Sequence, residues 1–202
     1  MGGIWELPYE ESENESPLSS LPKYQGRAYL GVDPGKSGAW ALIDETGAIL
    51  KVGMHTDLSE MISTLKWAAA EQYMVIACLE RAQAMPSQGV VSMFTYGQSF
   101  GEIIGILKSL GVPYELVSSN YWQKRVLDIM PAKEIKHNAE TKQENAGRRT
   151  KNRNALKAAT TAFVLRRFPK AIELLRLKKN QGVADAICIA LYSKARNERH
   201  GG

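Results

Sequence analysis

Apolar residues fall into short runs separated by turn signals, and five of these runs have the length of a strand. The first three follow one another closely, and Asp44-Glu45-Thr46-Gly47 is typical of a hairpin connection between the second and third. Residues 73–79 are apolar without a break, which indicates a buried parallel strand. The predicted strands are 28–32, 39–43, 49–53, 73–79 and 114–117.

Helical signals occupy much of the remaining chain. Asp57 and Glu60 have the spacing of a capping box, and an apolar face follows to about residue 71. The other predicted helices are 92–110, a short helix capped by Ser118, Ser119 or Asn120, 154–168 before Phe168-Pro169, and 181–191. This order of strands and helices predicts an α/β domain.

Two of the apolar strands stop in a carboxylate, the first at Asp33 and the fourth at Glu80. In open α/β sheets, sites form at the carboxyl ends of strands, so the two acids can converge if their strands are neighbours. Simpler interpretations stay open here. Asp33 can cap its own Pro34-Gly35 turn, and Glu80 can pair with Arg81.

Gly35-Lys36-Ser37 resembles the end of a phosphate-binding P-loop. That motif requires a glycine five residues before its Gly-Lys pair, where this chain has Leu30. No helical pattern follows the segment either, so a P-loop is excluded.

The predicted helix 181–191 is rich in Ala and Ile, and its only acid, Asp185, is expected in the first turn. The helix dipole ordinarily explains an acid there. Because the helix is otherwise apolar nearly all round, it must be buried, and a buried helix with one acid at its mouth suits a metal ligand.

The 202 residues suffice for one domain of ordinary size. No apolar run is long enough to span a membrane, and no signal or transit peptide is visible. Cys78 and Cys188 stand far apart in apolar segments and indicate buried thiols. We therefore expect a reducing compartment such as the cytoplasm.

Charge is distributed unevenly around a net value of +5. Residues 1–22 contain five Glu and no Lys or Arg, so the rest of the chain carries +10. The excess is concentrated between 137 and 179. A basic body favours a polyanionic partner such as nucleic acid, although solvated surface charge explains it as well.

Several segments offer candidate DNA contacts. A loop over 82–91 and the start of the following helix carry residues that could insert between unpaired bases, although an aromatic residue at helical spacing is by default core. Residues 130–150 are predicted to form a mobile basic loop, with a solvated linker as the plain alternative. The candidates are Met85, Gln88, Phe94, Lys124, Arg125, Arg148, Arg149, Lys151 and Arg153.

Short motifs in a fixed order resemble those of the RuvC-like Holliday junction resolvases, in their phage, bacterial and chloroplast branch. The motifs are Gly31-Val32-Asp33-Pro34-Gly35, Leu79-Glu80, Gly97-Gln98-Ser99-Phe100-Gly101, Tyr121-Trp122-Gln123-Lys124, Phe168-Pro169 and Ala184-Asp185-Ala186. The resemblance implies a ribonuclease-H-like mixed five-stranded sheet, its first three strands antiparallel, flanked by helices. The expected organisation is a disordered acidic leader over 1–26, a nuclease domain over 27–197 and a flexible tail over 198–202. The resemblance further implies the cytoplasm of a bacterium or phage-infected host, with an organelle stroma as the alternative.

The resemblance also implies an activity. Its members are homodimeric, structure-selective endonucleases that nick four-way DNA junctions symmetrically. Asp33, Glu80 and Asp185 match the family's metal-binding acids. Two Mg²⁺ ions about 4 Å apart, for which Mn²⁺ can substitute, would then serve phosphodiester hydrolysis.

One position departs from the family pattern. Relatives carry a further acidic or histidine ligand shortly before the last acid, where this chain has Asn180. An amide oxygen can ligate a metal but brings no negative charge, so the alternative is a catalytically weakened protein that binds branched DNA. A phosphotransferase of the actin or hexokinase type is disfavoured because no second phosphate loop is present.

Overall fold

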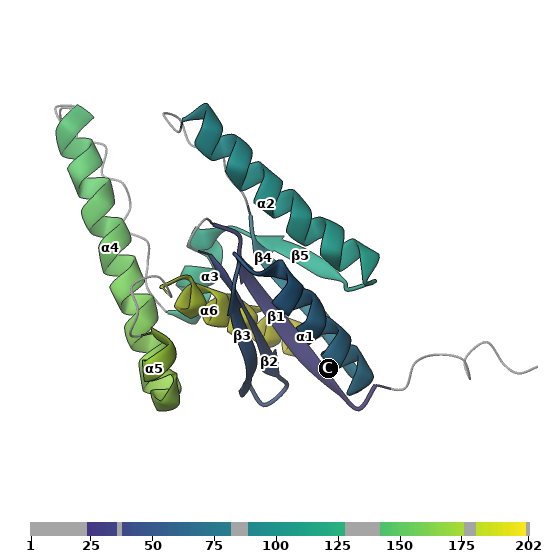
Figure 1. The fold of residues 1–202 in the computed structure, drawn as a ribbon. Helices are drawn as coiled ribbons and strands as arrows, with labels where there is room; N and C mark the ends of the chain where they lie inside the picture. The colour runs from purple at the N-terminus through teal and green to yellow at the C-terminus, as the bar shows by residue number, and fades with distance from the viewer. Residues whose placement is uncertain (1–23, 36–37, 82–88, 128–141, 176–180, 201–202) are drawn as a thin grey trace, which may run out of the picture.

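A mixed five-stranded sheet organises the computed structural model, which describes residues 24–35, 38–81, 89–127, 142–175 and 181–200 (Figure 1). The strand order is β3-β2-β1-β4-β5. The strands are β1 (Gly26–Asp33), β2 (Ala39–Asp44), β3 (Ile49–Met54), β4 (Tyr73–Glu80) and β5 (Tyr114–Val117). The first three pair antiparallel, and β4 and β5 run parallel to β1. This topology confirms the predicted mixed five-stranded sheet with its first three strands antiparallel.

Helices cover both faces of the sheet. The helices are α1 (Leu58–Ala70), α2 (Val90–Ser109), α3 (Ser119–Val126), α4 (Lys142–Arg167), α5 (Ile172–Leu175) and α6 (Gln181–His200), with a 3₁₀ turn at Pro169–Ala171. Apolar residues of α1 and α2 share one core with the sheet, whereas α3, α4 and α6 contribute to a second. Figure 1 shows α4 extending away from the sheet. None of the described helices combines the length and apolar character needed to cross a bilayer.

The strands divide their side chains between the two cores with the period of two that a pleated strand imposes. Along β1, Leu30 and Val32 face the core beneath α1 and α2, whereas Tyr29 packs with Ile43 and Ala190 on the α6 side. Gly31 meets α6 directly. A Cβ at this position would lie 2.1 Å from the carbonyl oxygen of Ala186, so only glycine lets the helix pack on the strand here.

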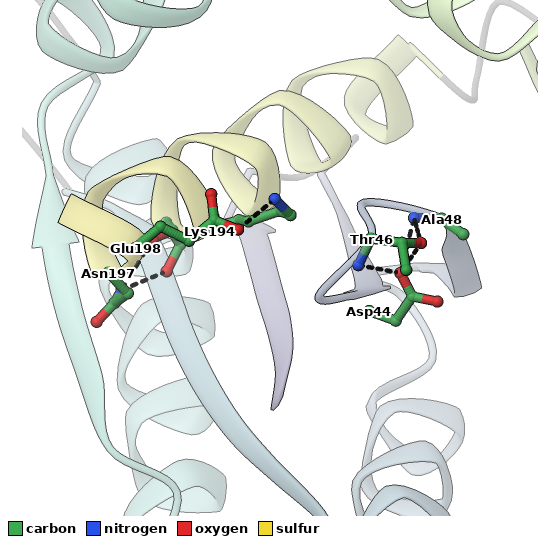
Figure 2. A network of polar contacts seen from close by, with 7 residues as sticks. Asp44, Thr46, Ala48, Lys194, Asn197 and Glu198 are labelled. Carbon is green, nitrogen blue, oxygen red and sulfur yellow. Dashed lines mark hydrogen bonds and ion pairs between the residues drawn. The ribbon is translucent and has the colours of Figure 1, made fainter. Parts of the chain in front are cut away.

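Two local sequence signals are confirmed. The Asp44 carboxylate accepts hydrogen bonds from the backbone N–H groups of Thr46 and Ala48, both at 2.9 Å, in the β2–β3 hairpin (Figure 2). Asp57 accepts from the N–H groups of Ser59 and Glu60 at the start of α1. Both cysteines are free and buried, as expected.

The basic segment departs from its prediction. α4 begins at Lys142, so the part of the predicted loop that the structure describes is helical. Residues 142–153 contain no proline and many Lys, Arg, Gln and Glu, which are good helix formers even where no apolar face is available. The lack of apolar residues in this segment therefore wrongly indicated a loop. The predicted helix 92–110 also begins earlier, at Val90.

The predicted domain limits lie partly outside the residues that the structure describes. Most of the acidic leader, residues 1–23, lies outside the described residues, and β1 begins at Gly26. At the other end, α6 continues to His200, beyond the expected boundary at 197.

Candidate functional site

Asp33 and Glu80 lie side by side at the carboxyl edge of the sheet. β1 and β4 are parallel neighbours whose register pairs Val32 with Leu79, so the next residue of each strand is the acid. The convergence expected from two acidic strand ends is therefore found. The described part of the chain shows no ion pair between Glu80 and Arg81.

Asp185 reaches the same site from α6. The close packing of this helix on Gly31 brings its N-terminal half to the end of β1. Because α6 begins at Gln181, Asp185 lies in the second turn of the helix. The sequence pattern had placed it in the first turn. The helix dipole acts mainly within the first turn, so it explains this acid poorly.

Burial disfavours the charged forms of all three carboxyl groups, and neighbouring negative charge adds to this effect at Asp33 and Asp185. Burial raises the pKa of Asp33 to about 8, and the negative charges of Glu80 and Asp185 add to that rise. Burial and the charge of Glu80 raise the pKa of Asp185 to about 7. The pKa of Glu80 is raised as well, chiefly by burial. Such a cluster is poised to bind a cation.

Partly compensating groups surround the acids. The indole N–H of the fully buried Trp122 donates a hydrogen bond to Glu80 Oε2 at 2.8 Å, and Ser119 hydrogen-bonds to the same carboxyl group. The positive charge of Lys157 lowers the pKa of both Asp33 and Asp185. The negative charge of each acid is therefore partly compensated, but the pKa of each acid remains above its ordinary value.

Sequence reasoning missed most of these partners. Lys157 and Thr160, which hydrogen-bonds to Asp185, are three residues apart on α4 and so share a face. Burial raises the pKa of Tyr96 on α2, and the negative charges of the nearby Glu80 and Asp33 raise it further. A buried tryptophan needs an acceptor for its N–H, so Trp122 could have been linked to a nearby acid.

A divalent cation suits the donors but would have to draw them closer. Three carboxylates supply the oxygen ligands that Mg²⁺ prefers. Among the described residues, however, no group of three or more His, Cys, Asp and Glu side chains is close enough to hold a metal ion. Asn180, the expected fourth ligand, lies outside the described residues.

The candidate DNA contacts are spread over three helices. Phe94 is 73% exposed near the start of α2, and Lys124 and Arg125 are exposed on α3. Lys151 is exposed on α4, and Arg148, Arg149 and Arg153 belong to the same helix. Met85 and Gln88 lie outside the described residues.

Comparison with solved structures finds several similar chains, two of which are structures of the same protein. Thermus thermophilus RuvC in complex with a Holliday junction substrate is 16% identical, with a TM-score of 0.46 over 86% of this chain and 96% of the other. A second Thermus thermophilus RuvC structure has the same identity and coverage and a TM-score of 0.43. No family model and no curated protein matches the sequence. At this identity, neither likeness identifies a reaction or a functional residue.

Proposed function

We propose that the protein is a metal-dependent endonuclease that cleaves phosphodiester bonds in branched DNA, chiefly four-way junctions. One observation carries the proposal: Asp33, Glu80 and Asp185, from β1, β4 and α6, are buried together, the pKa of each is raised by burial, and the charge of Glu80 raises the pKa of both aspartates further. Such an arrangement costs stability without a cation, so it is better explained by a binding role than by a structural one.

Asp33, Glu80 and Asp185 would hold divalent cations, with Mg²⁺ preferred and Mn²⁺ as a substitute. Two such ions, when bound, supply charge neutralisation and Lewis acidity for in-line displacement at phosphorus. Neighbouring side chains position the three acids. Trp122 fixes one oxygen of Glu80, and Lys157 places a positive charge beside the other two acids.

Substrate binding would use the basic helices. Lys124 and Arg125 on α3 lie on the helix whose Trp122 contacts Glu80, so phosphates bound there approach the acids. Arg148, Arg149, Lys151 and Arg153 give α4 a basic N-terminal half. Cations so placed neutralise backbone phosphates without reading sequence, which suits recognition by shape.

A homodimer would match the symmetry of a four-way junction. The first turns of α2 leave Val90, Val91 and Phe94 exposed, at 78%, 79% and 73% of their surfaces. Adjacent apolar side chains with this exposure favour a protein or nucleic-acid contact over solvent.

The direct test incubates an end-labelled four-way junction with the protein and Mg²⁺. We expect paired nicks in strands of like polarity, and no nicks with Asp185→Asn or in EDTA. Asn180→Asp should increase the rate by restoring a charged ligand. Failure of Asn180→Asp to cut with either Mg²⁺ or Mn²⁺ would refute the proposal.

A second candidate, a protein that binds branched DNA without cutting it, is favoured by two observations. Asn180 brings no charge, and the described acids do not form a closed metal group. This candidate predicts salt-sensitive binding of the junction with no product at any Mg²⁺ or Mn²⁺ concentration. Gel-shift and cleavage assays on the unaltered sequence separate the two functions.

A further inference from the structure

A cavity of about 410 Å³ lies between the end of β5, α3 and the C-terminal half of α6. It adjoins the acids at one end, because Val117 in its wall pairs with Glu80 in the sheet, and it extends away from them along α6. Asp185 and Arg196 are about three turns apart on α6, or roughly 16 Å of helical rise. The polar side chains that line the cavity are Ser118, Tyr121, Arg125, Tyr192, Arg196 and Arg199.

The cavity carries excess positive charge. Arg196 forms an ion pair with Glu115 and hydrogen-bonds to Tyr192, so its charge is largely compensated. Arg125 and Arg199 make no ion pair with a carboxylate in the part of the chain that the structure describes. Both guanidinium groups line the cavity, and their planar donor geometry matches phosphate oxygens.

One wall of the cavity is aromatic. The rings of Tyr121 and Tyr192 meet edge to face at 5.9 Å, which holds the half-exposed Tyr121 ring in place. The guanidinium carbon of Arg125 lies 5.8 Å from the centre of the Tyr121 ring. A flat, fixed aromatic surface beside two cations suits a ligand that joins a phosphate to a base.

We propose that this cavity binds a phosphorylated nucleotide unit, with the phosphate on Arg125 and Arg199 and the base against Tyr121. The volume falls in the range of small-molecule sites. The unit can be a free nucleotide or one nucleotide of a single DNA strand, because both present the same phosphate and base. The site does not depend on the proposed nuclease activity.

Titration calorimetry in EDTA tests the site with 5′-dAMP and, separately, with a short single-stranded oligodeoxyadenylate. We expect saturable binding of at least one probe, weakened at least tenfold by Arg199→Ala. Deoxyadenosine and inorganic phosphate, which each lack half of the ligand, should bind at least tenfold more weakly than 5′-dAMP. Binding of 5′-dAMP identifies a free nucleotide as sufficient, and binding of the oligonucleotide alone identifies a strand.

Lys194→Ala is the matched control. Lys194 lies on the same helix and carries the same charge, but it pairs with Glu198 at 2.6 Å and does not line the cavity (Figure 2). It should bind the probes within twofold of the unaltered protein. Tyr121→Leu supplies a second variant that keeps every charge and should also weaken binding. No binding of either probe, or equal losses in Arg199→Ala and Lys194→Ala, would overturn the proposal, as would unchanged binding in Arg199→Ala.

Discussion

The indole N–H of Trp122 donates to Glu80 Oε2 across 2.8 Å, and this bond joins α3 to the end of β4. The two residues are far apart in the chain, and the bond is partly buried. α3 therefore holds one of the three acids from outside the sheet, and the same helix presents Tyr121 and Arg125 to the cavity.

Trp122→Phe keeps an apolar ring but removes the donor. We expect the free energy of unfolding to fall by about 1–3 kcal/mol, since a buried carboxyl group loses its partner. Cleavage should fall through kcat, with KM for the junction little changed, because Glu80 is less well positioned. A purely structural role for Trp122 would instead lower stability and leave the kcat of the folded fraction intact.

Asp33→Asn should change the pH dependence of stability. The pKa of Asp33 rises from 3.8 to about 8 on folding, so the folded protein holds this proton more tightly than the unfolded chain. In EDTA the contribution of Asp33 is therefore complete below about pH 4 and is lost as the pH rises toward 8, at no more than about 1.4 kcal/mol per pH unit.

Urea denaturation at several pH values measures this effect. The variant should gain stability relative to the unaltered protein as the pH increases. Parallel pH profiles would contradict the prediction. Adding Mg²⁺ should stabilise the unaltered protein at pH 8 and have a smaller effect on Asp33→Asn.

Lys157→Gln should make the acids harder to ionise. The positive charge of Lys157 lowers the pKa of both Asp33 and Asp185, so its removal raises them further. The pH midpoint of Mg²⁺ binding should move upward by about 1 unit. Lys66→Gln, an exposed lysine on α1, is the control and should leave the midpoint unchanged.

Gly31→Ala should be severely destabilising, by about 3 kcal/mol or more, because the added Cβ would overlap the backbone of α6. Gly105→Ala on α2 meets nothing within 4 Å and should stabilise by about 0.5–1 kcal/mol. Thermal denaturation should show a lower melting temperature for Gly31→Ala and a higher one for Gly105→Ala. Similar melting temperatures would show that α6 can move away from β1 at little cost.

Replacing the apolar side chains at the start of α2 should distinguish a dimer contact from a DNA contact on that surface. Val90→Ser with Val91→Ser should shift a dimer toward monomer in light scattering if the surface joins two copies. Phe94→Ser should weaken junction binding without that shift if Phe94 stacks on bases. A monomeric unaltered protein would contradict the proposed homodimer.

The sequence predicted the sheet well because its strands carry strong local signals. Continuous apolar runs, the Asp44 hairpin and the Asp57 cap each depend on residues close together in the chain. Asp33 and Glu80 were expected to converge only if their strands are neighbours, and the parallel pairing of β1 with β4 meets that condition.

The partners of the acids could not be predicted in the same way. Trp122 and Lys157 reach the site from helices whose placement depends on packing across the whole domain. The N-terminal half of α4 lacks apolar periodicity, so its helical state rests on propensity alone. The start of α6 at residue 181 was predicted correctly, but Asp185 is the fifth residue of the helix and therefore lies beyond the first turn, to which it had been assigned.

The packing of α6 on Gly31 has a consequence for the order of synthesis. α6 is the last described element to leave the ribosome, and it carries Asp185. A nascent or truncated chain that stops before residue 181 can pair β1 with β4, but it holds two acids of the three. Any chemistry that needs all three acids is therefore withheld until α6 has been made and has packed on β1.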